Sequence, residues 1–269
     1  MSLAPGPRHW PYPRWIAHRG AGKLAPENTL AAFKLGHAHG WRMFECDVKL
    51  SADGVPFLLH DATLERTTNG QGTAGQLPWA QLAGLDAGSW LAPAYAGEPI
   101  PTLQTIARFC LDHDSLLNIE IKPTPGTERQ TGEVLAQAAA QLWQGASVPP
   151  LLSSFQPESL LGAQAAAPAL PRALLLDSLW EGWLESAQRL ACVAVVCKYT
   201  LWDAALVARV RAAGLRCLCY TVNDAGAAQG LLALGLDGLI SDRVDHFDPA
   251  RADSVAVNPH AASDVKKDH

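Results

Sequence analysis

The sequence predicts an α/β fold, a distorted (β/α)8 TIM-type barrel with one accessory antiparallel strand and a small insertion. Short apolar runs alternate with longer amphipathic segments along most of the chain, which is the pattern of repeated βα units around a parallel sheet. The length of 269 residues is close to that of a single-domain barrel. We therefore expect one domain over residues 1–269, with its core at about 14–248.

The expected elements follow from the period of the apolar residues. Nine runs have the length and composition of strands: 15–18, 43–50, 55–60, 116–121, 151–155, 173–176, 193–198, 216–222 and 238–241. Seven segments have a helical period: 28–39, 102–113, 128–143, 157–166, 180–190, 202–213 and 225–233. Gly40, Gly214 and Gly235 follow three of these helices, where a left-handed cap favours glycine.

Nine strands are one too many for a barrel of eight. Residues 51–54, Ser-Ala-Asp-Gly, are a short hairpin turn and cannot make a parallel crossover. The run 55–60 is therefore expected to pair antiparallel with 43–50, outside the barrel. If Leu50 faces Val55, then Glu45 lies opposite His60.

Two segments fall outside this scheme. Residues 61–99 have no strong period, and a long connection of this kind in a compact domain is often functional. We expect this insertion to lie over the barrel mouth. Residues 249–269 are polar and are expected to form a flexible tail.

Composition and charge exclude several classes of protein. The chain is 48% hydrophobic and 17% charged, with a net charge of −5, so we expect no nucleic-acid partner. No apolar run reaches the length of a membrane span, so stable membrane insertion is not expected. The six cysteines lack metal-site spacing and the N-terminal segment lacks an apolar signal region, which together favour reduced thiols and a cytoplasmic location. Oligomeric state is left open.

Polar residues gather at the ends of four predicted strands. Glu45 and Asp47 lie two residues apart, as do Glu120 and Lys122, so each pair projects to one face. Carboxylates inside a barrel must be protonated, paired or metal-bound. Glu45, Asp47 and Glu120 therefore predict a site for one divalent cation, Mg²⁺ or Ca²⁺. The alternatives are an acidic strand face in solvent and an internal salt bridge between Glu120 and Lys122.

Two histidines follow strands that border this cluster. His18 and His60 are the predicted acid/base pair, because imidazole titrates nearest neutral pH. Arg19 offers a planar fork of donors that suits a phosphate, and Lys122 adds a second positive charge. These residue types together indicate phosphoryl chemistry on an anionic diester.

Three further residues near these motifs have two interpretations each. Asp61 could cap the turn that follows it or belong to the site. Asn28 and Glu27 could each belong to the N-cap of the following helix or orient the site; we favour the cap for Asn28 and orientation of the site for Glu27.

The motifs and their order resemble the glycerophosphodiester phosphodiesterase family over about residues 15–248. The resemblance is carried by IAHRG, PENTLAAF, FECDVKLSADGVPFLLHDATLERTTNG, IPTL, NIEIK, SSF, YTVND and DGLISD. The joint spacing of HRG, ExD, HD and ExK is specific, whereas any one of these motifs alone is weak.

The resemblance implies a distorted (β/α)8 barrel that hydrolyses glycerophosphodiesters to sn-glycerol 3-phosphate and an alcohol. By matching motif, Glu45, Asp47 and Glu120 resemble the metal ligands, and His18 and His60 the acid/base pair. The matching substrate contacts are Arg19, Lys122 and, at a position where the family often has tryptophan, Tyr220. The chain is most similar to the cytosolic bacterial members, which act on deacylated phospholipids.

Several points stay open at this stage. A glycoside hydrolase would need neither the histidine pair nor the two cations. A non-catalytic binding protein would have no reason to keep both histidines and all three carboxylates. A phospholipase acting on intact lipid is the nearer alternative, although no basic amphipathic helix supports it. The preferred alcohol, the choice of ion and the acid and base assignments of the histidines are not determined. Attack by the substrate's own 2-hydroxyl is favoured over direct attack by water.

Overall fold

The computed structural model describes residues 10–251, and within them a single sheet closes into a barrel. Adjacent barrel strands are parallel, and the ring closes where the first strand pairs with the second. The barrel strands are β1 (Trp15–Ala17), β2 (Met43–Leu50), β4 (Leu116–Ile121), β5 (Leu151–Ser154), β6 (Arg172–Leu176), β7 (Ala194–Lys198), β8 (Arg216–Tyr220) and β9 (Gly238–Ser241). The predicted fold class is confirmed.

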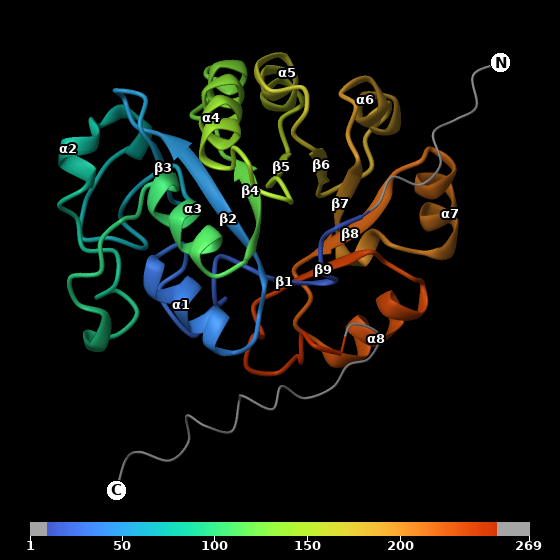
Figure 1. Cartoon of the computed structure of the whole chain (residues 1–269), viewed down its shortest axis with the longest axis horizontal. Helices are drawn as coiled ribbons and strands as arrows, with labels where there is room; N and C mark the ends of the chain where they lie inside the picture. Colours follow the sequence, from blue (N-terminus) through green and yellow to red (C-terminus); the bar gives the residue numbers. More distant parts are fainter. Residues whose placement is uncertain (1–9, 252–269) are drawn as a thin grey trace, which may run out of the picture.

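Helices surround the strands on the outside of the ring (Figure 1). They are α1 (Leu30–Ala38), α3 (Leu103–Asp112), α4 (Glu128–Leu142), α5 (Pro157–Ala166), α6 (Trp183–Arg189), α7 (Ala204–Ala212) and α8 (Ala225–Ala233). Most bounds lie within two residues of the sequence prediction. Helix α6 is the exception and starts three residues late, because Gly182 before it has a left-handed φ of +82°.

The core has two parts because successive residues of a strand face opposite sides of the sheet. Outward-facing residues such as Phe44, Ile119 and Val195 pack beneath the helices. Inward-facing residues such as Ile16, Met43 and Leu151 fill the barrel interior away from its mouth. Polar side chains occupy the inward positions nearer the carboxyl ends of β2 and β4, so the site lies above a packed apolar floor.

Pairing around the ring is uneven. Strands β2 and β4 are paired over six positions, from Met43 with Leu116 to Val48 with Ile121. Strands β1 and β2 share a single pair, Ala17 with Phe44.

The accessory strand β3 (Pro56–Leu58) pairs antiparallel with β2, as predicted, but one residue out of the predicted register. Leu50 lies opposite Pro56, so His60 is not level with Glu45. The cause is the turn, in which Ser51 N donates to Val55 O at 3.1 Å and Gly54 adopts a φ of +82°. Three residues, 52–54, lie between the hydrogen-bonded Ser51 and Val55. Hairpin loops of this length require a left-handed residue at the position that Gly54 occupies.

The insertion at 61–99 is more structured than the sequence indicated. It contains the turns η1 (Ala74–Gln76) and η2 (Pro93–Tyr95) and the short helix α2 (Trp79–Leu82), none of which has a clear period in the sequence. These elements pack on a small apolar cluster that includes Leu64 and Leu82 and also Phe57 of β3. The insertion is thus a compact subdomain beside α1 and α3.

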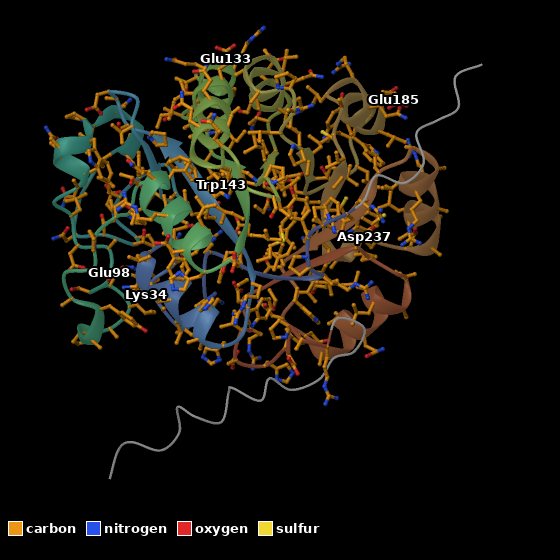
Figure 2. The ribbon with its side chains drawn as sticks, viewed as in Figure 1. Lys34, Glu98, Glu133, Trp143, Glu185 and Asp237 are labelled. Carbon is orange, nitrogen blue, oxygen red and sulfur yellow. The ribbon has the colours of Figure 1, made fainter. Side chains whose placement is uncertain are left out.

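A carboxylate of the insertion fixes it to the barrel. Glu98 Oε1 accepts a hydrogen bond from Ala31 N at 2.9 Å, in the first turn of α1. Glu98 and Lys34 also line a cavity of about 260 Å³ between the insertion and this helix, and Figure 2 shows the two side chains close together at the edge of the molecule.

The remaining expectations concern the termini and the membrane. Most of the predicted flexible tail falls outside the described residues, which end at Arg251. In residues 10–251 no helix combines the length and apolar character needed to cross a bilayer. The six cysteines are all buried and unpaired.

Candidate active site

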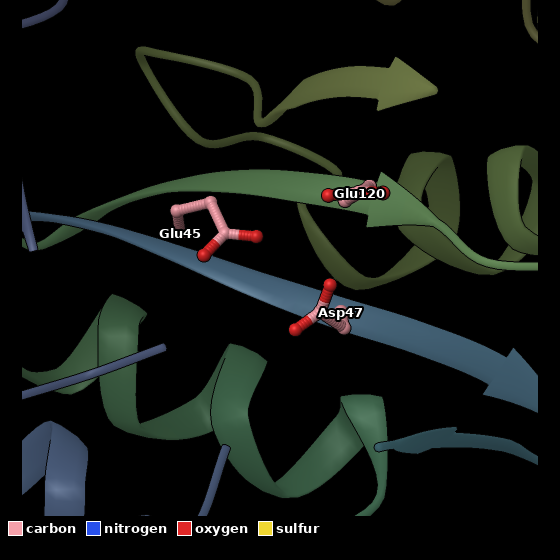
Figure 3. A group of neighbouring side chains, drawn as sticks. All are labelled: Glu45, Asp47 and Glu120. Atoms are coloured by element: carbon pink, nitrogen blue, oxygen red, sulfur yellow. The ribbon is translucent and has the colours of Figure 1, made fainter. Parts of the chain in front are cut away.

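Three carboxylates converge at the carboxyl ends of β2 and β4. Glu45 and Asp47 project from β2, and Glu120 projects from β4, where it pairs in register with Asp47. One oxygen from each of the three lies within 4.8 Å of the others, and Figure 3 shows the side chains facing one another between the two strands. All three are buried, so the strand alternation found in the sequence brings together the residues that it predicted.

Two cations share this space with the carboxylates. Arg19 Nε lies 3.2 Å from Asp47 Oδ2, and Lys122 Nζ lies 2.7 Å from Glu120 Oε1 and 3.5 Å from Asp47 Oδ1. Burial opposes ionisation of Asp47, but the charges of Arg19 and Lys122 outweigh burial and hold the pKa of Asp47 below its usual range. The salt bridge between Glu120 and Lys122, an alternative interpretation of the sequence, is thus present and forms part of the carboxylate cluster.

The other two carboxylates are poorly compensated. Burial and the neighbouring Asp47 raise the pKa of Glu45 well above its usual range, and the same two causes raise the pKa of Glu120 to about 7. Asp47 Oδ1 is buried and accepts no hydrogen bond from the described residues. Three oxygen donors with excess negative charge fit a hard divalent cation. The cluster could hold one metal ion.

His18 is held from the far side of its ring. Its Nδ1 lies 2.6 Å from Asp242 Oδ1, and its Nε2 lies 3.8 Å from Glu45 Oε2. Asp242 is held in turn by Asn223, whose Nδ2 donates to Asp242 Oδ2 at 2.8 Å. The hydrogen bond between His18 and Asp242 fixes the ring orientation and presents Nε2 to the cluster.

His60 has the same arrangement on the other side. Its Nδ1 lies 2.7 Å from Asp61 Oδ1, and burial lowers its pKa below the usual value. Each of the two predicted histidines thus has an aspartate on Nδ1, which leaves Nε2 for a ligand. Asp61 belongs to the site, which resolves its two interpretations. Asp242 was missed, although it is the last residue of the DGLISD motif.

The loop after β1 is folded tightly around the carboxylates. Arg19 and Asn28 have positive φ values of 52° and 60°, and Arg19 N donates to Glu45 Oε2 at 3.1 Å. Asn28 was expected to cap α1, but Thr29 is the N-cap. Asn28 instead contacts Asp47 twice, by Nδ2 to Oδ2 at 2.8 Å and by accepting from Asp47 N at 3.1 Å. Strained residues of this kind collect at functional sites.

A second arginine extends the network into the insertion. Arg66 donates to Asp61 through Nε at 2.6 Å and to Glu27 through Nη2 at 2.7 Å. Glu27 also accepts from Arg19 Nη1 at 2.8 Å, so its interpretation as an orienting residue agrees with the structure. Sequence reasoning missed Arg66, and the only signal was its place in the motif LERTTNG after His60.

The histidines, the two cations and two of the carboxylates border a cavity of about 200 Å³ at the barrel mouth. Its lining includes seven of the eight predicted site residues; Asp47 lies beneath the surface. The full lining is His18, Arg19, Glu45, His60, Asn118, Glu120, Lys122, Phe155, Leu175, Tyr220, Thr221 and Ile240.

Part of the cavity wall is aromatic. The rings of Phe155 and Tyr220 meet edge to face with centroids 5.7 Å apart, and Lys122 Nζ lies 5.7 Å from the Phe155 centroid. Tyr220 donates its hydroxyl to Leu176 O at 3.2 Å, so its ring rather than its hydroxyl faces the cavity. No residue of the insertion lines this cavity. The insertion therefore supports the site through Asp61 and Arg66.

Comparison with known proteins identifies the lineage. The model of the glycerophosphoryl diester phosphodiesterase family matches residues 18–246. The chain belongs to this family. A glycerophosphodiester phosphodiesterase of Caldanaerobacter subterraneus is 35% identical over 232 residues, which cover 84% of this chain and 93% of the relative. Membership of the family confirms the resemblance and the hydrolase class expected from the sequence.

Solved structures of the family have the same fold. An Oleispira antarctica phosphodiesterase in complex with the product sn-glycerol-3-phosphate has a TM-score of 0.80 and 36% identity, and the match covers 86% of this chain and 93% of that chain. A glycerophosphodiester phosphodiesterase from Agrobacterium tumefaciens has a TM-score of 0.73 at 26% identity, covering 87% and 98% of the two chains.

Proposed function

We propose that this family member hydrolyses glycerophosphodiesters to sn-glycerol 3-phosphate and an alcohol. The observation that carries the proposal is the pair of histidines, each held by an aspartate on Nδ1, at one cavity with two cations and three carboxylates. The Oleispira phosphodiesterase, whose structure was solved with sn-glycerol-3-phosphate as product, supports the same chemistry.

Arg19 and Lys122 are the proposed phosphate-binding residues. Their charged groups lie within 3.5 Å of the carboxylate cluster and their side chains are about one fifth exposed, and both residues line the cavity. A diester phosphate carries one negative charge, which the arginine fork and the lysine ammonium can bind with charge-assisted hydrogen bonds.

The proposed metal ligands are Glu45, Asp47 and Glu120. One divalent cation, Mg²⁺ or Ca²⁺, would neutralise charge on the phosphate oxygens when bound there. Without a cation, the three buried carboxylates repel one another, as the raised pKa values of Glu45 and Glu120 reflect.

The two histidines are proposed to move the protons. One Nε2 takes the proton of the attacking hydroxyl and the other Nε2 gives a proton to the departing alkoxide. Asp61 and Asp242 keep each ring oriented and stabilise its charged form. The geometry is similar for both rings, so each can serve as acid or as base.

The substrates proposed are soluble diesters in the cytoplasm. The cavity of about 200 Å³ is large enough for a glycerophosphoryl group, and its aromatic wall of Phe155 and Tyr220 suits the carbon atoms of a small ligand.

The decisive experiment is an assay of the purified chain with glycerophosphocholine, glycerophosphoethanolamine and a lysophospholipid, in the presence of Mg²⁺ or Ca²⁺. Release of sn-glycerol 3-phosphate from the soluble diesters is expected, and the double variant H18A/H60A is the control. Release of glycerol together with phosphocholine would show cleavage of the other ester bond. Turnover of the lysophospholipid alone would contradict the proposed substrate class.

A further inference from the structure

Asn118 is a buried polar residue of the cavity that no step described above uses. It precedes Glu120 by two residues on β4, so both side chains point into the barrel, with Asn118 about 7 Å farther back along the strand from its carboxyl end. It lies in register with Glu45 on β2 and is 1% exposed, yet it lines the cavity. Neither its amide nitrogen nor its oxygen makes a hydrogen bond with any described residue.

An amide in this state calls for a partner. Leaving a buried polar group without a hydrogen bond destabilises the fold, and most buried polar groups in folded proteins are therefore paired. The side chain borders an open cavity rather than closed packing, so a ligand can supply the missing partner. Asn118 thus marks the deep end of the cavity as a built polar position.

The surroundings define the chemistry of that partner. A carboxamide both donates and accepts, which complements a hydroxyl group. An anion would meet the adjacent carboxylate of Glu45, so a phosphate is not suited to this depth. Leu175 and Ile240 line the same cavity and are apolar, which suits the carbon chain of a small alcohol. A neutral polyol fits all three conditions.

We propose that Asn118 binds the terminal hydroxyl of the glycerol group and so makes the enzyme specific for glycerol. This inference rests on the proposed function, which places the phosphate at Arg19 and Lys122. The terminal hydroxyl is the substrate atom farthest from phosphorus on the glycerol side. The enclosed end of the cavity receives this fixed part of the substrate, while the alcohol that varies and departs lies towards the open mouth.

The test is a comparison of two substrates on two proteins. One substrate is sn-glycero-3-phosphocholine, and the other is the phosphocholine diester of propane-1,2-diol, which lacks only the terminal hydroxyl. The wild type should prefer the glycerol diester on the order of a hundredfold in kcat/KM, because the analogue leaves the amide unpaired. In Asn118→Leu this preference should fall to nearly one, through loss of activity on the glycerol diester alone.

Two controls separate a specific role from a structural one. Ser153, on the neighbouring strand and outside the cavity lining, is a second buried polar residue without a hydrogen-bond partner among the described residues. Ser153→Ala should keep the preference for the glycerol diester. The melting temperature of Asn118→Leu should be equal to or higher than that of the wild type, because the variant removes an unpaired amide. Equal loss of activity on both substrates would overturn the proposal.

A binding measurement keeps the inference distinct from the proposed function. Calorimetric titration of the wild type should show tighter binding of sn-glycerol 3-phosphate than of propane-1,2-diol 1-phosphate, and Asn118→Leu should bind the two alike. Absence of turnover with this binding difference intact would count against the proposed function alone. Equal binding of both phosphates by the wild type would overturn the role of Asn118.

Discussion

Arg66 and Glu27, 39 residues apart in the chain, are joined by two hydrogen bonds, from Nη1 to Oε2 at 2.8 Å and from Nη2 to Oε1 at 2.7 Å. The same guanidinium also donates to Asp61 from Nε at 2.6 Å. Glu27 contacts Arg19 and Asp61 contacts His60. One side chain of the insertion therefore links the proposed phosphate-binding arginine to one of the two histidines.

Replacing Arg66 should weaken the site without unfolding the barrel. Arg66→Met is expected to lower kcat/KM roughly tenfold to a hundredfold, because misplaced catalytic groups lose reactive geometry. Arg66→Lys should recover only part of the activity, because lysine lacks the planar fork.

The pH dependence of kcat/KM provides a second test of the role of Arg66. Its hydrogen bonds are the main cause of the lowered pKa of Asp61, so without them Asp61 should accept a proton at higher pH. The acid limb of kcat/KM should then move to higher pH. Arg129→Met, which removes an exposed arginine paired with Glu133, is the matched control. Identical profiles for Arg66→Met and the wild type would rule out this linkage.

The two histidines should behave as one unit. His18→Ala and His60→Ala are each expected to lose on the order of a hundredfold or more in kcat. The double variant should lose far less than the product of the two losses, because residues acting in one proton-transfer cycle are non-additive. Steady-state kinetics of the three variants decides the matter, and multiplicative losses would indicate independent roles.

Removal of the divalent cation should abolish turnover. Excess chelator is expected to stop release of sn-glycerol 3-phosphate, and added Mg²⁺ or Ca²⁺ to restore it. Glu45→Gln should also be inactive, yet the metal-free variant should melt at a higher temperature than the metal-free wild type, because it replaces a carboxyl group whose ionisation burial and Asp47 oppose with a neutral amide. Full activity in excess chelator would contradict the assignment of all three carboxylates.

Asp242 should contribute to stability in a pH-dependent way. Burial opposes its ionisation, but the hydrogen bonds from His18 and Asn223 outweigh burial and lower its pKa in the folded state. A carboxyl group with a lowered pKa stabilises the fold above the unfolded pKa, about 3.9 for aspartate, and that stability is lost as the pH falls through the folded value. Asp242→Asn should therefore melt below the wild type at neutral pH, with a gap that narrows in acid. A gap that stays constant with pH would assign Asp242 to packing alone.

The identity of the nucleophile can be tested with the substrate. We expect the glycerol 2-hydroxyl to attack phosphorus first, because it is already tethered nearby, and water to open the resulting cyclic phosphate. An analogue with hydrogen in place of this hydroxyl should bind without being cleaved, and the cyclic phosphate should be detectable by phosphorus NMR during turnover. Cleavage of the analogue at a comparable rate would leave direct attack by water.

The elements of the fold were predictable because they depend on local sequence. The alternation in Glu45-Cys46-Asp47 sufficed to place two carboxylates on one face, and three of the nine strands keep their predicted bounds. The pairing of β2 with β3 was missed by one residue, since the number of turn residues outside the ladder depends on the left-handed Gly54. Counting along a strand does not reveal that detail.

The parts of the site that were missed depend on contacts between distant segments. Asp242 reaches His18 across 224 positions of sequence, and Asn28 contacts Asp47 because its own positive φ turns the loop back on β2. Arg66 and Asn118 lie in the motifs LERTTNG and NIEIK, but nothing in those motifs indicates what the two side chains contact. Such roles become visible only when hydrogen-bond partners are known.

Strands β1 and β2 share a single residue pair, Ala17 with Phe44, so their junction, here called the seam, has the fewest paired residues of the ring. Arg19 and Asn28 span the seam, because they contact Glu45 and Asp47 across it. Arg19, a proposed phosphate-binding residue, thus also helps to hold β1 and β2 together. A ligand bound in the cavity should therefore make local opening of this seam less frequent. The backbone amide of Asp47, which donates to Asn28 across the seam, should then exchange its hydrogen more slowly when a ligand is bound, even without catalysis.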